Sequence, residues 1–191
     1  MMMTPSLPTS SGRSTVRAPI KSELIVGNGK EICLGKSSNI SSKGILFQIP
    51  KRESSPPPQV VSTLIKLPSL SPFDNSEIES LPLNFDHQVL RVKIEIVRTV
   101  TMAPQVEERG QLYLAGNFKS PTPEIVATLT SLVEIYRDNM EYLLKMIDLL
   151  QQDRDLLEKI FFYSSQLGYI NLPIEQLKQT LRHDYHSIKI A

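Results

Sequence analysis

Histidine and cysteine are common at catalytic and metal centres, and this chain of 191 residues holds three histidines and one cysteine. His183 and His186 flank Asp184 and present two imidazoles for a metal ion, but no third ligand stands at a suitable spacing. Cys33 stands in an apolar stretch without a neighbouring general base, so we expect it to pack as a small hydrophobic side chain. The sequence therefore predicts no catalytic residue, no metal site and no cofactor, and we expect the protein not to be an enzyme.

Gly35-Lys36-Ser37 matches the end of a phosphate-binding loop. The full pattern needs a glycine at position 30, where the chain has lysine, and the polar segment after Ser37 predicts a loop instead of the required helix. Asn39-Ile40-Ser41 fits an N-glycosylation acceptor, but no secretory signal precedes it, so we interpret it as chance. These departures argue against nucleotide binding, and we expect no small-molecule substrate.

Basic residues are concentrated in the first quarter of the chain. Up to position 52 there are eight basic and two acidic residues, and the remainder holds thirteen basic and eighteen acidic ones. A basic segment on a mildly acidic body favours an anionic partner, and we expect RNA or an acidic membrane surface. The alternative is that scattered basic residues only solubilise a loose tail. The predicted anion-binding residues are Arg13, Arg17, Lys21, Lys51 and Arg52.

Serine, threonine and proline dominate the first twenty residues, which contain no acidic side chain. This composition predicts a disordered basic arm over 1–20. An organelle transit peptide is the alternative, and the prolines argue against its amphipathic helix. Residues 21–191 are expected to form a single α+β domain, with a proline-rich linker at 50–58 in the polyproline II conformation.

Alternating apolar and polar residues predict the strands that must position these groups. Apolar runs at 24–26 and 32–34 flank Asn28-Gly29 and predict a hairpin, because Asn-Gly favours the positive φ of a tight turn. Further strands are expected at 44–49, 60–67, 88–102 and 111–115. The alternation within 88–102 slips at Val97, which predicts a bulge there.

Apolar residues recur at helical spacing from Pro123 to Leu167. Thr122 is the expected N-cap, and Gly168 is expected to end the helix. A straight helix of this length would span about 65 Å, so we expect a break or bend near 152–155. Acidic and basic residues alternate on its polar side, which is typical of solvated ion pairs and not of a paired-carboxylate site.

The last thirty residues predict a short helix that starts at Pro173, followed by a short edge strand from Tyr185 to Ile190. The spacing of the two helices is similar to the first half of a helix-turn-helix unit. No recognition helix follows, which argues against DNA binding of that type.

A second apolar stripe lies beside the first one on the long helix. A small sheet and a short helix can cover only part of such a helix, so we expect this stripe to contact other chains. We therefore expect protein partners and self-association, most simply as a homodimer. The predicted interaction face consists of Val126, Val133, Met140 and Leu144.

The predicted fold class is α+β, with a small antiparallel sheet packed against one long and one short helix behind a disordered basic N-terminal arm. The predicted function is a non-enzymatic scaffold or assembly protein that makes protein–protein contacts through the long helix, while its arm touches an anionic surface. An RNA- or nucleoprotein-binding factor is the alternative. Without a long apolar run or a signal peptide, we expect no transmembrane segment, no secretion and a location in the cytoplasm or nucleus.

A basic Ser/Pro-rich arm, the run Ser55-Pro56-Pro57-Pro58 and the strand from Leu90 to Arg98 together make a recognisable layout. This layout resembles the matrix proteins of negative-strand RNA viruses, rhabdoviruses in particular. The resemblance implies a structural virion protein that bridges nucleoprotein and membrane. The chain departs from that pattern because no PPxY motif follows the prolines and because its long helix contrasts with a mostly β family.

Overall fold

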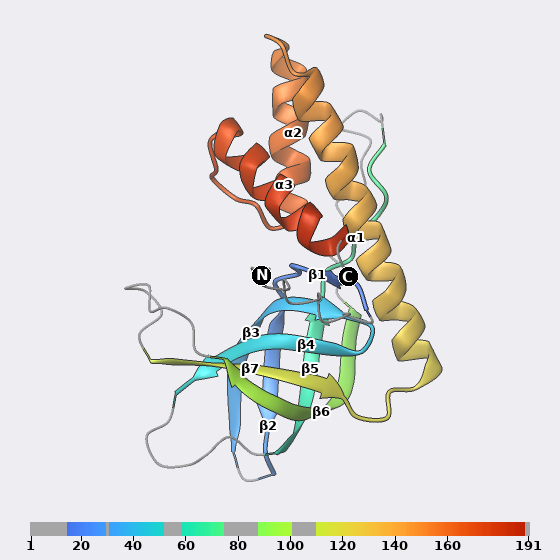
Figure 1. Cartoon of the computed structure of the whole chain (residues 1–191), viewed down its shortest axis with the longest axis vertical. Helices are drawn as coiled ribbons and strands as arrows, with labels where there is room; N and C mark the ends of the chain where they lie inside the picture. Colours follow the sequence, from blue (N-terminus) through green and yellow to red (C-terminus); the bar gives the residue numbers. More distant parts are fainter. Residues whose placement is uncertain (1–14, 30, 52–58, 75–87, 101–109, 190–191) are drawn as a thin grey trace, which may run out of the picture.

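The computed structural model describes residues 15–29, 31–51, 59–74, 88–100 and 110–189. Figure 1 shows the strands wrapped into a barrel and the helices stacked beyond one end of it. The helices are α1 Pro123–Leu149, α2 Arg154–Gln166 and α3 Ile174–Lys189. The strands are β1 Arg17–Ala18, β2 Glu23–Gly27, β3 Ile32–Ser41, β4 Gly44–Pro50, β5 Val60–Leu67, β6 Gln88–Val100 and β7 Gln111–Phe118.

The sheet closes on itself, and this corrects the predicted fold class. Neighbouring strands follow the order β3-β2-β5-β6-β7-β4, and β4 pairs back with β3 from Lys36↔Gln48 to Ile40↔Ile45. Six antiparallel strands therefore form a closed barrel, while β1 adds to β3 through the pairs Arg17↔Ser41 and Ala18↔Ile40. The expected small sheet against one long and one short helix is wrong, because closure pairs both edges of the sheet and the described residues include three helices.

The barrel interior is apolar because alternate residues of its strands point inward. On β5 every second residue from Val61 to Leu67 is buried, and on β6 every second residue from Leu90 to Ile94 is buried. Full burial of one such aliphatic side chain stabilises the fold by roughly 1.5–3 kcal/mol. The residues between them face outward, which leaves the outer wall free to carry charged groups.

Two glycines let strands approach closely where the barrel curves. A Cβ on Gly116 of β7 would run into the Ile94 side chain of β6. A Cβ on Gly44 of β4 would lie 2.5 Å from the Gly116 carbonyl oxygen. The start of β4 and the last residues of β7 therefore meet backbone to backbone, next to the helices.

The hairpin and the bulge that the sequence predicts are confirmed. Strands β2 and β3 pair around a turn in which the Asn28 side-chain oxygen accepts the Glu31 N–H at 2.8 Å and Gly29 has a φ of +86°. The register of β6 against β7 shifts between Ile96 and Arg98.

Strand β3 extends further than the sequence predicts, because hydrogen bonds satisfy its polar second half. The Ser37 hydroxyl accepts the Ser22 N–H and donates to the Ile20 carbonyl oxygen, both at 2.6 Å. A serine paired in this way can be buried in a strand although its composition favours a loop. Ile20 and Ala18 are themselves buried in the core, and residues 1–14 of the predicted arm lie outside the described ranges.

The helix ends and the break are confirmed. The Thr122 hydroxyl oxygen accepts the Ile125 N–H at 3.4 Å, and α1 ends at Leu149 before Asp153 caps α2. Gly168 has a φ of +86°, and the following residue donates its N–H back to the last turn of α2. The predicted edge strand at 185–190 is wrong: α3 continues to Lys189 because Leu181 and Ile188 keep the helical spacing of its buried side.

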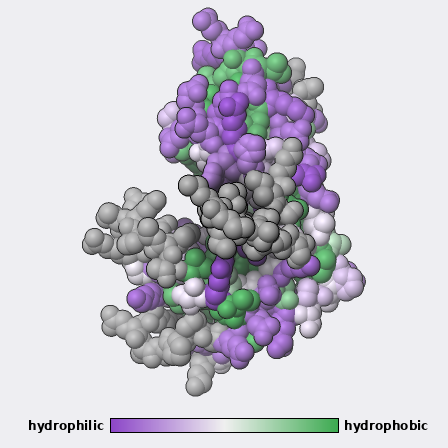
Figure 2. Space-filling view, in the orientation of Figure 1, coloured by the Kyte–Doolittle hydropathy of each residue, from purple (hydrophilic) through white to green (hydrophobic). Residues whose placement is uncertain are grey.

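The second stripe of α1 is largely covered within the chain. Val133 and Met140 are buried in the core, Leu144 packs against it, and Val126 is half-buried. The basis for self-association, that a small sheet and a short helix could cover only part of this stripe, is therefore wrong. Hydrophilic side chains dominate the exposed surface of the helices in Figure 2, and apolar ones mix among them over the barrel.

Residues 68–74, which follow β5, form a strap on α1 and α2. Asn139, buried on α1, donates to the Ser71 carbonyl oxygen and accepts the Phe73 N–H, both at 2.8 Å. The Phe73 ring stacks on Tyr163 of α2 with centroids 4.1 Å apart, and the Tyr163 hydroxyl donates to the Asp74 carbonyl oxygen at 2.9 Å. The strap thus ties the end of β5 to the helices through hydrogen bonds to backbone groups and one aromatic stack.

No helix in the described ranges combines the length and apolar character needed to cross a membrane.

Candidate anion-binding pocket

A pocket of about 510 Å³ opens where the barrel meets α1. Three segments wall it: residues 15–17 at β1, the turn between β3 and β4, and the end of β7 with its connection to α1. This volume lies in the range of small-molecule sites. The pocket is the natural place to look for a ligand, since elements from both halves of the molecule converge on it.

The β3–β4 turn is built around one buried serine. The Ser41 hydroxyl accepts the N–H groups of Lys43 and Gly44, at 3.3 and 3.1 Å, and lies 3.1 Å from the Gly44 carbonyl oxygen, to which it donates. The Phe118 N–H donates to the Lys43 carbonyl oxygen at 2.9 Å, which fixes the turn against β7. Because Gly44 has no room for a side chain, the turn holds the lysine in one backbone position at the pocket wall.

Positive charge gathers in this pocket. Arg17 on β1 and Lys43 on the turn both line it and are exposed, and no acidic residue is among the described residues of its wall. Arg17 pairs with Ser41 in the β1–β3 register, so the two cations approach from adjacent backbone segments. Such a constellation stabilises a phosphate or carboxylate through charge-assisted hydrogen bonds.

A nearby arginine lines a separate cavity. Ser42 also lines a smaller cavity of about 120 Å³ that reaches Arg137 on α1. The Arg137 guanidinium donates to the Asp138 carboxylate at 3.0 and 2.8 Å, and this hydrogen bond raises the pKa of Arg137. Its charge is therefore balanced within the helix.

Asn39 adds an unsatisfied acceptor two residues before Ser41. Its side-chain oxygen is buried and has no hydrogen-bond partner in the described part of the chain. A buried acceptor left without a donor costs roughly 1–3 kcal/mol. The strand that leads into the turn therefore retains the capacity to accept one hydrogen bond.

The three predicted anion-binding residues that the structure describes do not come together. Arg17 lines the pocket, whereas Lys21 and Lys51 are exposed elsewhere and are not part of its wall. Arg13 and Arg52 lie outside the described ranges, as do residues 52–58 of the predicted linker. Their role in anion binding stays a prediction.

Sequence reasoning missed Ser41, Lys43 and Gly44. The available signal was the spacing Asn39-x-Ser41-x-x-Gly44, which we interpreted only as a chance glycosylation acceptor. A serine that can cap its own turn, three residues before a glycine, is a pattern of tight strand connections. Within the described ranges no three histidine, cysteine, aspartate or glutamate residues form a group that could hold a metal ion.

No family model and no curated protein matches the chain. Among solved structures it is similar to the Bacillus subtilis inhibitor of motility MotI/DgrA, with 13% identity and a TM-score of 0.47 over 64% of this chain and 50% of that one. It is also similar to the Borreliella burgdorferi PlzA protein in complex with c-di-GMP, with 15% identity and a TM-score of 0.38 over 61% and 45%. The PilZ domain of CeSA from a cellulose-synthesizing bacterium gives 14% identity and a TM-score of 0.36 over 62% and 94%. The chain spans about half the length of MotI/DgrA and PlzA.

These findings correct several expectations. The chain forms a closed barrel of six strands, and none of the three solved structures named above is a viral matrix protein, so the resemblance to viral matrix proteins is wrong, and with it the virion location. The scaffold interpretation is wrong as well, because the long helix covers its apolar side within the chain. The expectation of protein and RNA partners without a small-molecule ligand is corrected as well, because the junction of barrel and α1 holds a pocket of about 510 Å³, the size of a small-molecule site. The PlzA structure, for its part, was determined in complex with c-di-GMP.

Proposed function

We propose that the protein is a non-enzymatic binding protein for a phosphate-bearing small molecule, which occupies the pocket between β1, the β3–β4 turn and the start of α1. The observation that carries the proposal is the approach of Arg17 and Lys43 to one pocket of ligand size, with no carboxylate in its described wall. Guanidinium and ammonium groups are the usual protein partners of phosphate oxygens.

A nucleotide is the class of ligand that we favour. The pocket, at about 510 Å³, is larger than an inorganic phosphate needs. The unpartnered oxygen of Asn39 lies next to the turn and suits a donor such as the amino group of a base. Val126 of α1 forms part of the wall, so an occupied pocket would act on the position of the helices relative to the barrel. This arrangement supports a regulatory role, and a location inside the cell stays a prediction.

Isothermal titration of the full chain tests the proposal. The first probe is c-di-GMP, the ligand of the PlzA structure, and GTP and inorganic phosphate are titrated alongside it. We expect saturable binding of a nucleotide with one site per chain. Arg17→Gln and Lys43→Gln should each weaken it about 10- to 100-fold, since a hydrogen bond to a charged group contributes roughly 1.5–3 kcal/mol.

Lys36→Gln is the matched control, because Lys36 is an exposed lysine of β3 that does not line the pocket. Its titration should match that of the unchanged chain. Absence of saturable binding by either nucleotide at millimolar concentration would overturn the proposal, as would equal binding by the control and the two pocket variants.

A further inference from the structure

A second pocket lies on the outer wall of the barrel, on the other side of the β7–α1 connection. Its volume is about 470 Å³, and it shares only Phe118 and Pro121 with the first pocket. The rest of its wall comes from β5, β6 and residues 119–125. None of the residues proposed to hold the first ligand contributes to it.

Three basic side chains line this second pocket. Arg91 and Lys93 alternate on the outward face of β6, and Lys119 directly follows β7. The Lys119 N–H donates to the Lys93 carbonyl oxygen at 2.8 Å, so the two lysines leave adjacent points of the backbone. All three are exposed, and within the described ranges none of them forms an ion pair.

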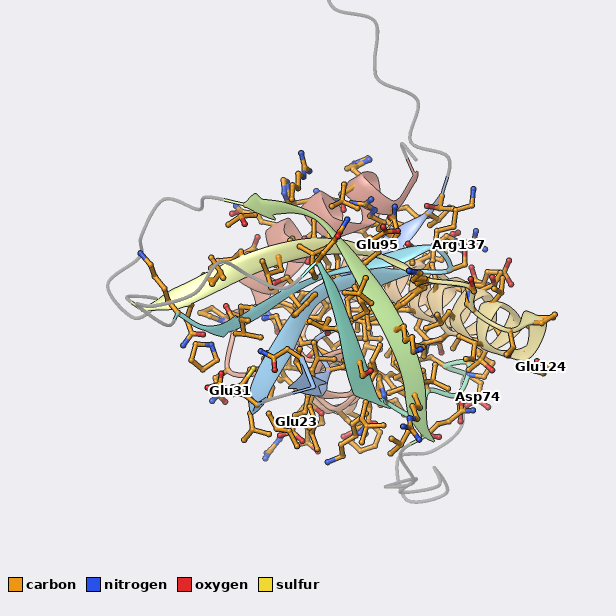
Figure 3. All side chains as sticks on the ribbon, turned by 90° about the horizontal axis from the view of Figure 1, so that it is seen from below. Glu23, Glu31, Asp74, Glu95, Glu124 and Arg137 are labelled. Atoms are coloured by element: carbon orange, nitrogen blue, oxygen red, sulfur yellow. The ribbon has the colours of Figure 1, made fainter. Side chains whose placement is uncertain are left out.

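The surroundings offer little negative charge to balance them. No aspartate or glutamate is among the described residues of the wall. Glu95 lies further along β6, and Glu124, whose pKa is lowered by a hydrogen bond from Thr122, points outward at the start of α1 (Figure 3). The start of α1 itself is already capped, because Thr122 accepts the Ile125 and Val126 N–H groups.

We propose that this second pocket binds a polyphosphate group, and that it does so independently of the first pocket. Three cations of one sign around one hollow repel one another, and a ligand with two or more negative charges relieves that repulsion. The volume accommodates a diphosphate together with part of a nucleoside. Hydroxyl groups of Ser62 and Ser120 lie in the same wall and are available as further donors to phosphate oxygens.

The test uses the isotope-labelled full chain and inorganic pyrophosphate, with amide shifts followed by NMR at constant ionic strength. We expect saturable shifts at Lys93, Lys119 and Ser120. The double variant Lys93→Gln/Lys119→Gln should raise the dissociation constant at least tenfold. Arg98→Gln is the matched control, because Arg98 is an exposed cation of β6 outside the pocket wall.

Two further variants test whether the second pocket binds independently of the first. Arg17→Gln, in the first pocket, should leave the shifts at Lys93 and Lys119 unchanged, and Glu124→Gln should tighten pyrophosphate binding by removing a nearby negative charge. Shifts that never saturate below 10 mM, on the order of the weakest specific affinities, would overturn the proposal. Equal weakening by Arg98→Gln would overturn it too, since binding would then follow net charge alone.

Discussion

The barrel and the helical unit, which consists of α1, α2 and α3, both carry basic side chains, but the groups that surround these side chains differ. In the helical unit most of the described basic residues of α1, α2 and α3 have a carboxylate within reach. At the junction of barrel and helices, Arg91, Lys93 and Lys119 have no such partner in the described part of the chain. The helical pairs are Lys145–Glu141 at 2.9 Å, Lys178–Asp148 at 2.8 Å, Arg182–Asp148 at 3.3 Å, Arg154–Glu158 at 3.3 Å and Arg137–Asp138 at 2.8 Å.

This difference separates charges that support the structure from charges that are available to a ligand. A cation already paired with a carboxylate loses that partner when it binds an anion, so it gains little. Arg91, Lys93 and Lys119, which have no such partner in the described part of the chain, gain the whole interaction. We therefore expect large binding effects from substituting basic residues at the junction and small stability effects from substituting the exposed helical pairs, while large stability effects come from the buried contacts of the helices.

The largest stability effect is expected from Met140→Glu. Met140 is fully buried in the core of the chain, so the substitution places an unpaired carboxylate there. We expect the free energy of unfolding to fall by roughly 3–5 kcal/mol in chemical denaturation. Glu134→Gln, an exposed position of the same helix, should change it by less than about 0.5 kcal/mol. If the Met140→Glu chain instead stays folded and changes only its oligomeric state, Met140 lies in an interface between chains, as the sequence alone predicts.

The next largest effect is expected from Asn139→Ala, which removes both hydrogen bonds between α1 and the strap. It leaves the Ser71 carbonyl and the Phe73 N–H without their partner, at a cost of roughly 2–3 kcal/mol. Hydrogen exchange at the Phe73 amide should accelerate more than exchange within the barrel. Ser131→Ala, at an exposed position of α1, serves as control, and unchanged protection at Phe73 would show that the strap is held by other contacts.

The smallest effect is a pH dependence at the helical ion pairs. A hydrogen bond from Lys178 lowers the pKa of Asp148, and the charges of Lys178 and Arg182 add to this. A carboxyl whose pKa is lowered by folding stabilises the fold above its unfolded pKa, near 3.8, and loses that contribution as the pH falls through the folded value. Asp148→Asn should therefore lower the denaturation midpoint slightly at pH 7 and hardly at all at pH 2. A difference of equal size at both pH values would exclude the linkage.

Local patterns predicted the elements because each depends on neighbours in the chain. A few consecutive residues determine each of three features: the Asn28-Gly29 turn, the Thr122 cap and the interruption of α1 before Asp153. Barrel closure was not predictable in this way. It depends on β4 pairing with β7, where Gly44 meets Asn117, more than seventy residues away, and only the two glycines at that contact hint at it.

The candidate site was predicted only in part for the same reason. Arg17 was found because a basic segment is visible in the composition, but its pocket is formed by a distant turn and by α1. Lys43 looked like one of several scattered lysines until the Ser41 turn placed it beside Arg17. The polar segment after Ser37 was predicted as a loop, since the hydrogen bonds of Ser37 to Ile20 and Ser22 cannot be read from local sequence.

One paired titration tests the central claim most directly. The double variants Arg17→Gln/Lys43→Gln and Lys178→Gln/Arg182→Gln remove the same number and kind of charges from the junction and from the helical unit. We expect the first to lose at least about 100-fold in affinity for c-di-GMP, or for whichever probe nucleotide the unchanged chain binds, while its thermal midpoint stays within 2 °C, the scatter expected of neutral surface substitutions. The second should retain its affinity and lose thermal stability. Equal affinities in the two double variants would contradict the division between structural and ligand-binding charges.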